Sequence, residues 1–134
     1  MSALLIDTNI VSILFKPYHT LYAECFDAVR GHQSFVSFMT RSEILLWPKL
    51  NNWGERRREE LSNHLNAFTT LFPDEETCVA WSDIIAACRA AGRPLDEADA
   101  WIAATARQWS LPLLTANQRH FDYIENLTVI PIPR

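Results

Sequence analysis

Short apolar runs alternate with segments of helical periodicity along this chain, and this alternation constrains its fold more than any other feature. The first run, Leu4-Leu5-Ile6, has the length of a buried strand, and Asp7 or Thr8 after it can cap a helix. Further strands are predicted at residues 34–37, 71–72, 111–115 and 127–130. Apolar strands joined through amphipathic helices are typical of a parallel sheet with helices on both faces. We therefore predict an α/β fold with a central, mainly parallel sheet.

The length and composition favour a single globular domain over residues 1–134. A chain of this length can bury enough apolar surface to fold without a disulfide or a structural metal. The three cysteines form no C-x-x-C motif, and no two of the four histidines have metal-ligand spacing on one helix, so neither a disulfide framework nor a zinc site is expected. No apolar run reaches the roughly 20 residues of a membrane span, and the first residues do not resemble a signal peptide. We therefore expect a cytoplasmic protein without membrane contact.

Local signals predict where the middle helices begin and end. Thr40 is predicted to cap the helix after the second strand, with Glu43 at the third helical position completing a capping box. Pro48 is expected to kink that helix or end it early. A further helix is predicted from Trp53 to Thr70.

Four polar residues occupy places where an α/β fold gathers its functional groups. Each follows a strand or leads a helix, as residues at the carboxyl ends of parallel strands do; they are Asp7, Glu43, Asp99 and Asn117. Carboxylate oxygens are preferred ligands of Mg²⁺ and Mn²⁺. One or two such ions can supply the activated water and the charge stabilisation that phosphodiester hydrolysis needs. The pattern is therefore compatible with a metal-dependent nuclease.

Each of these residues also has a purely local interpretation, which spacing alone leaves open. Asp7 can simply cap the following helix, and Glu43 can be the reciprocal half of the capping box. Asp99 can be a first-turn carboxylate that is favoured by the dipole of a helix capped by Asp96. Asn117 can be an ordinary turn residue.

Three segments resemble the motifs of PIN-domain proteins: LLIDTNIVS, VSFMTRSEI and DEADAWIAATARQWSLPLLTANQRHF. They occur in the family's order between Leu4 and Phe121, and the short length is similar to that of VapC-type toxins. The resemblance implies a Rossmann-like three-layer α/β/α sandwich around a central, mainly parallel sheet. It also implies the function of a type II toxin: a divalent-metal-dependent endoribonuclease that hydrolyses phosphodiester bonds of RNA.

The resemblance identifies five candidate catalytic residues: Asp7, Thr8, Glu43, Asp99 and Asn117. It implies that Asp7 and Asp99 bind Mg²⁺ or Mn²⁺ directly, and that Glu43 completes the metal site or holds a water. Thr8 is expected to orient a carboxylate or a water.

The chain departs from the family pattern after the fourth predicted strand. Asn117 stands where some members of the family have a fourth acid, and an amide contributes an oxygen without charge. This favours one tightly bound ion and a second that arrives with the substrate. Asp122 lies nearby and is a candidate to compensate, and Thr115 is a weaker candidate for the orienting role of Thr8.

The net charge of −4 does not favour nucleic-acid binding by itself, because phosphate affinity comes from Lys and Arg. A basic cluster in the middle of the chain is the candidate for contacts to flanking phosphates; it consists of Lys49, Arg56, Arg57 and Arg58. The alternative is a solvated helix face on which these residues pair with neighbouring glutamates.

The resemblance implies two protein partners, a VapB-type antitoxin and a second copy of the chain. An apolar groove lined by some of Ile13, Phe15, Trp47 and Trp53 is expected to suit an amphipathic antitoxin segment. Two other functions stay open. One is a catalytically weak or inactive PIN-fold module that binds RNA or protein; the other is a nuclease that cuts DNA.

Overall fold

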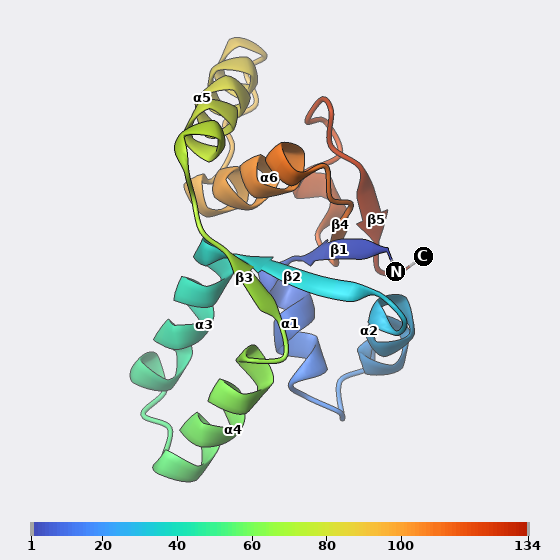
Figure 1. The fold of residues 1–134 in the computed structure, drawn as a ribbon, viewed down its shortest axis with the longest axis vertical. Helices are drawn as coiled ribbons and strands as arrows, with labels where there is room; N and C mark the ends of the chain where they lie inside the picture. Colours follow the sequence, from blue (N-terminus) through green and yellow to red (C-terminus); the bar gives the residue numbers. More distant parts are fainter. Residues whose placement is uncertain (1, 134) are drawn as a thin grey trace.

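The computed structural model describes residues 2–133 and contains a five-stranded sheet in which every neighbouring pair of strands is parallel (Figure 1). The strand order is β3-β2-β1-β4-β5. The strands are β1 (Ala3–Ile6), β2 (Gln33–Ser37), β3 (Thr69–Leu71), β4 (Leu113–Thr115) and β5 (Val129–Pro131). The chain therefore reverses its direction of travel across the sheet between β1 and β4, where α/β folds open a crevice at the carboxyl ends of the strands.

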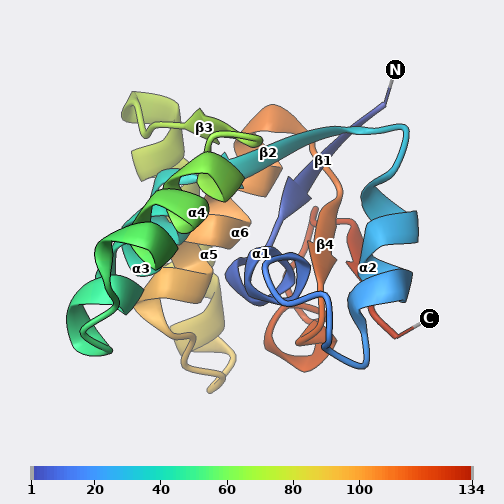
Figure 2. The same ribbon diagram turned by 90° about the horizontal axis from the view of Figure 1, so that it is seen from below.

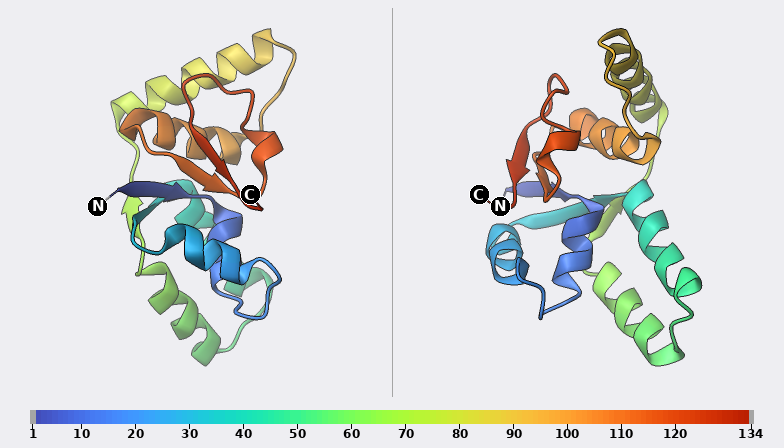
Figure 3. Two further views of the ribbon diagram at one scale, coloured as in Figure 1. Left: turned by 90° about the vertical axis from the view of Figure 1, so that its right-hand side faces the viewer. Right: turned by 180° about the vertical axis from the view of Figure 1, so that it is seen from behind.

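Helices cover both faces of the sheet (Figures 1 and 3). One face carries α1 (Thr8–Leu14), α2 (Tyr22–Val29), α3 (Phe38–Leu50) and α4 (Glu55–Leu65). The other carries α5 (Glu75–Ala90) and α6 (Glu97–Trp109), and a short 3₁₀ turn, η1 (Gln118–His120), follows β4. The predicted three-layer α/β/α sandwich with a parallel sheet is confirmed.

The side chains of β1 explain why its sequence is apolar at every position. Leu4 and Ile6 pack into the core beneath α1 to α4, whereas Leu5 packs into the second core beneath α5 and α6. All three are buried, because a central strand of a three-layer fold has a core on each side.

The prediction of how α3 begins is wrong. The helix begins at Phe38, directly after β2, and the hydroxyl of Ser37 caps it by accepting a hydrogen bond from the backbone N–H of Met39 at 3.1 Å. Thr40 is therefore inside the first turn and Glu43 is not the partner of a capping box. Pro48 does not end the helix early, since α3 continues to Leu50 with Pro48 buried in its last turn.

The helix predicted from Trp53 to Thr70 is too long. Only Glu55–Leu65 is helical, and Thr69–Leu71 forms the edge strand β3, which pairs with β2 from Phe35↔Thr69 to Ser37↔Leu71. The strand predicted at 71–72 thus begins two residues earlier. No helix within residues 2–133 is both long and apolar enough to cross a membrane.

Candidate active site

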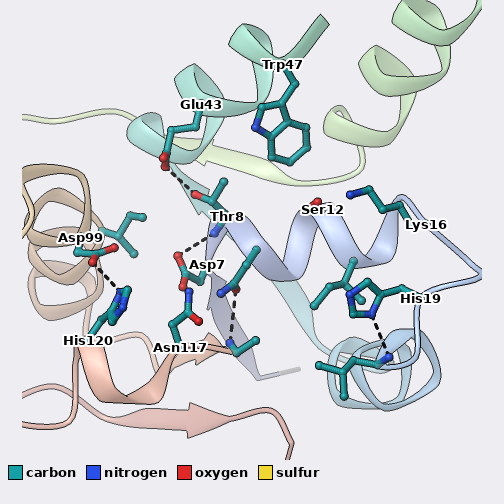
Figure 4. A pocket seen from close by; sticks show the side chains of 15 residues that line it. Asp7, Thr8, Ser12, Lys16, His19, Glu43, Trp47, Asp99, Asn117 and His120 are labelled. Atoms are coloured by element: carbon teal, nitrogen blue, oxygen red, sulfur yellow. Dashed lines mark hydrogen bonds and ion pairs between the residues drawn. The ribbon is translucent and has the colours of Figure 1, made fainter. Parts of the chain in front are cut away.

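A pocket of about 550 Å³ opens at the carboxyl ends of β1 and β4, at the point where the strand order reverses (Figure 4). All five residues that the sequence singles out as catalytic line it: Asp7, Thr8, Glu43, Asp99 and Asn117. Residues far apart in the chain meet here because β1 and β4 are neighbours in the sheet and α1, α3 and α6 begin at this edge.

Asp7 follows β1 and both caps α1 and lines the pocket. Its Oδ1 accepts the backbone N–H of Thr8 at 2.8 Å, and its Oδ2 accepts the hydroxyl of Thr115 at 2.6 Å. The side chain is buried, and this desolvation raises its pKa, while the hydrogen bonds from Thr115 and Thr8 act in the opposite direction. The same carboxylate therefore caps α1 and forms part of the candidate site.

Glu43 lines the pocket from α3, and a hydrogen-bonded pair of threonine hydroxyls holds its carboxylate. Thr8 donates its hydroxyl hydrogen to Glu43 Oε1 at 2.8 Å, and its Oγ1 lies 2.9 Å from that of Thr40. Because Thr8 has only one hydroxyl hydrogen, Thr40 is the donor in the second bond. Burial raises the pKa of Glu43, the bond from Thr8 lowers it, and the charge of Asp7 raises it. Thr8 thus hydrogen-bonds the Glu43 carboxylate at the edge of the pocket.

Asp99 lies in the first turn of α6 and contacts His120, which the sequence does not single out. Its Oδ2 lies 3.0 Å from His120 Nδ1. Burial and the charge of Asp7 raise the pKa of Asp99 to about 6, and they outweigh the opposing effect of His120. His120 lies in η1, next to the fully buried Phe121. The His-Phe pair at the end of the third motif is the sequence feature from which a role for His120 could have been predicted.

Asn117 and Thr115 hold the loop after β4 against Asp7. The backbone N–H of Asn117 donates to Thr115 Oγ1 at 2.9 Å, and Thr115 in turn donates to Asp7. The Asn117 side chain lies beside Asp7 in Figure 4. Asn9, a second polar residue that the sequence does not single out, accepts the backbone N–H of Ala116 at 3.4 Å and ties α1 to this loop.

The oxygen ligands of this pocket suit a divalent cation that keeps several waters, rather than one coordinated by protein side chains alone. Among residues 2–133, no three His, Cys, Asp or Glu side chains are grouped so that they could hold a metal ion together. Mg²⁺, however, keeps several waters and needs only one or two carboxylates. Asp7, Glu43 and Asp99 share one pocket, and the charge of Asp7 raises the pKa of both Glu43 and Asp99, so a positive charge among them would relieve this repulsion.

The predicted basic cluster lies outside this pocket. Arg56 pairs with Glu60 at 3.5 Å, Arg57 lies 3.9 Å from the centroid of the Trp53 ring, and Arg58 donates its Nε hydrogen to the Trp53 carbonyl at 2.8 Å. Lys49 and Arg58 line a separate cavity of about 340 Å³ between α3 and α4.

The sequence profile of the PIN domain matches residues 4–127. This chain belongs to the PIN domain family. The predicted resemblance is thereby confirmed, and all three motifs that carry it lie within the matched residues. The pocket of this PIN domain is lined by one acidic residue from each motif: Asp7, Glu43 and Asp99.

Similar proteins are found by both sequence and structure. Ribonuclease VapC1 of Haemophilus influenzae (strain R2866) is 27% identical over 128 residues, which are 92% of this chain and 92% of the relative. The structure of VapBC2 from Rickettsia felis, bound to a DNA fragment from its promoter, has a TM-score of 0.85 at 16% identity and covers 96% of this chain and 98% of that one. A toxin–antitoxin complex from Klebsiella pneumoniae has a TM-score of 0.69 at 26% identity and covers 95% of each chain. At 16% identity, the likeness to VapBC2 establishes the fold alone.

Proposed function

We propose that this PIN domain is a metal-dependent endoribonuclease and the toxin of a type II toxin–antitoxin pair that acts in the cytoplasm. The observation that carries the proposal is the convergence of Asp7, Glu43 and Asp99, from three separate segments, in one pocket. Repelling carboxylates are costly to gather unless a cation binds between them. RNA is the proposed substrate because the similar curated protein is named a ribonuclease.

Each residue of the site has a proposed task in hydrolysis. Mg²⁺ or Mn²⁺, bound by Asp7, Glu43 and Asp99, would lower the pKa of a water and offset the negative charge of the phosphate. Thr8 and Thr115 hold the Glu43 and Asp7 carboxylates in place.

His120 and Asn117 complete the proposed set. His120 contacts one carboxylate oxygen of Asp99, and the other oxygen is the proposed ligand of the cation. The amide of Asn117 hydrogen-bonds the phosphate without adding negative charge, and its neutrality favours one tightly bound ion with a second that arrives with the RNA.

The proposed protein partners are a VapB-type antitoxin and a second copy of this chain. Of the residues expected to line an apolar groove, Ile13 and Trp47 line the pocket that also holds the acidic residues, whereas Phe15 and Trp53 are partly buried and pack against the core. The exposed apolar side chains of α3 are instead the proposed antitoxin contact: Leu45, Leu46 and Leu50. Support for the antitoxin comes from the similar proteins of known structure, which are toxin–antitoxin complexes.

The basic cluster is proposed to contact only RNA that extends beyond the pocket. Its side chains are exposed on or beside α4, and two of them are engaged by Trp53. Such contacts would change affinity for long RNA more than for short RNA.

The test is cleavage of a labelled RNA panel, transfer RNA included, by antitoxin-free protein with Mg²⁺, with Mn²⁺ and with EDTA. We expect metal-dependent cleavage that Asp7→Asn reduces by about 100-fold or more, since even outer-shell changes at metal sites cost about 10–100-fold. Asp83→Asn, an exposed change on α5, is the matched control. Folded protein that binds RNA but cuts nothing would support the inactive binding module, and cleavage of DNA alone would support a DNA nuclease.

A further inference from the structure

The pocket extends well beyond the acidic residues, along a seam between α1 and α3. On α1 it is lined by Thr8 and Ser12, one turn apart, and beyond the end of α1 by Lys16. On α3 it is lined by Glu43 and Trp47, also one turn apart. With a rise of 1.5 Å per residue, Ser12 lies about 6 Å along α1 from Thr8, and Lys16 follows two residues after the helix ends at Leu14. Figure 4 shows Lys16 and Asp99 at opposite ends of the pocket, and Figure 2 shows α1 lying between α2 and the α3–α4 pair.

Lys16 gives the far end of the pocket a positive charge. It is the one Lys or Arg among the described residues that line the pocket. Its side chain is half-buried, and within residues 2–133 no carboxylate forms an ion pair with it. A partly desolvated ammonium without a protein counter-charge is suited to an anionic ligand.

His19 places a second donor beside Lys16. The backbone N–H of His19 donates to the Lys16 carbonyl at 2.8 Å, so residues 16–19 form a tight turn, and Pro17 at its second position favours that conformation. His19 Nδ1 accepts the backbone N–H of Leu21 at 3.0 Å. The ring hydrogen of a neutral imidazole is therefore on Nε2, which is left as a donor.

We propose that Lys16 and His19 form a phosphate subsite for single-stranded RNA, with Trp47 stacking a base between this subsite and the metal-binding end. The inference rests on the proposed nuclease function and adds the substrate's path to it. An ammonium and an N–H donor suit a phosphate oxygen, and an aromatic ring on the way suits a base of any identity. The acidic end and the basic end thus hold successive phosphates of one strand, the first through a cation and the second directly.

The test combines variants with single neutral linkages in the RNA. A short cleavable RNA is made as a series in which one phosphate at a time is replaced by an uncharged methylphosphonate, and kcat and KM are measured for each. In the wild-type protein we expect one neutral linkage, away from the scissile bond, to raise KM about 10-fold, since a charge-assisted hydrogen bond has about that effect. Lys16→Ala should raise KM by a similar factor with kcat within about twofold, and that same linkage should then cost nothing further.

Conservative variants and a matched control separate binding from folding. Lys16→Arg and His19→Gln retain a charge or a donor and should recover most of the affinity that Lys16→Ala and His19→Ala lose. Arg89→Ala removes one exposed charge from α5, on the opposite face of the sheet, and should leave KM unchanged. Thermal melts of every variant report folding.

The outcomes distinguish this subsite from the nuclease function. Cleavage by the wild type with an unchanged KM in Lys16→Ala overturns the subsite and leaves the function standing. Absent cleavage, with RNA binding that still depends on Lys16, supports the subsite and overturns the function. Unchanged RNA binding in Lys16→Ala with weakened binding of an acidic antitoxin segment overturns the RNA subsite in favour of a protein ligand.

Discussion

Single residues in this site serve both the local structure and the pocket. Asp7 caps α1 with one oxygen and accepts Thr115 with the other, so its local interpretation and its candidate metal role coexist. Asp99 contacts His120 at 3.0 Å, yet its pKa is raised to about 6 because burial and the charge of Asp7 outweigh that contact. The carboxylates are therefore placed at a cost in stability when no cation is bound.

Removing the charge of Asp99 should stabilise the metal-free protein. Its pKa rises from the ordinary 3.8 to about 6 on folding, so the folded state binds the proton more tightly than the unfolded state. The stability that protonation of Asp99 contributes is fully present below its unfolded-state pKa of 3.8 and is lost as the pH rises through its folded-state pKa of about 6. In EDTA at about pH 7.5, Asp99→Asn should gain about 1–2 kcal/mol, less than the full shift because of solvent screening.

Chemical denaturation in EDTA at about pH 4 and about pH 7.5 measures this effect. The gain should be confined to the higher pH, and the exposed Asp83→Asn should show none. A loss of stability in Asp99→Asn at both values would contradict the assigned repulsion.

At the scale of elements, the start of each helix decides where its carboxylate points. Asp96 caps α6 by accepting the backbone N–H groups of Ala98 at 2.9 Å and Asp99 at 3.4 Å, as predicted. Ser37 does the same for α3, and this earlier start places Glu43 in the second turn, where it meets Thr8. The Thr-x-x-Glu pattern matches a capping box, but these side chains are used for contacts with α1.

The cap of α6 can be tested separately from the charge of its capping residue. Asp96→Ala removes the acceptor and should cost about 1 kcal/mol of unfolding free energy, whereas Asp96→Asn, which still caps, should cost a few tenths at most. Asp96→Ala should also weaken metal binding more than Asp96→Asn does, because Asp99 lies in the first turn of α6, which the cap holds in place. Equal losses in both variants would show that the charge matters and the cap does not.

At the scale of the whole molecule, the site exists because of strand order and layering. β1 and β4 are adjacent, so Asp7 meets the loop of Asn117 although more than a hundred residues separate them. α3 and α6 pack on opposite faces of the sheet and deliver Glu43 and Asp99 from either side (Figures 1 and 4). A cation bound at this point links both layers.

Mg²⁺ should therefore stabilise the entire fold. With about tenfold excess over Kd, binding adds roughly 1.4 kcal/mol, which corresponds to a rise in Tm of about 3–5 °C for a domain of this size. Differential scanning fluorimetry with Mg²⁺, with EDTA, and with NaCl at matched ionic strength measures it. The rise should be absent in Asp7→Asn; an equal rise in NaCl or in that variant would indicate salt screening instead.

The sequence by itself determined the alternation of elements, the parallel sheet and the acidic residues, because burial, periodicity and motif spacing are local properties. It also marked Asp96 as a cap and Thr8 as an orienting group. The start of α3 at Phe38, the Asp99–His120 contact and the place of Lys16 and His19 in the pocket were decided by the tertiary structure. These depend on which strands are neighbours and which helix faces meet, and such long-range contacts are not encoded in the spacing of any one segment.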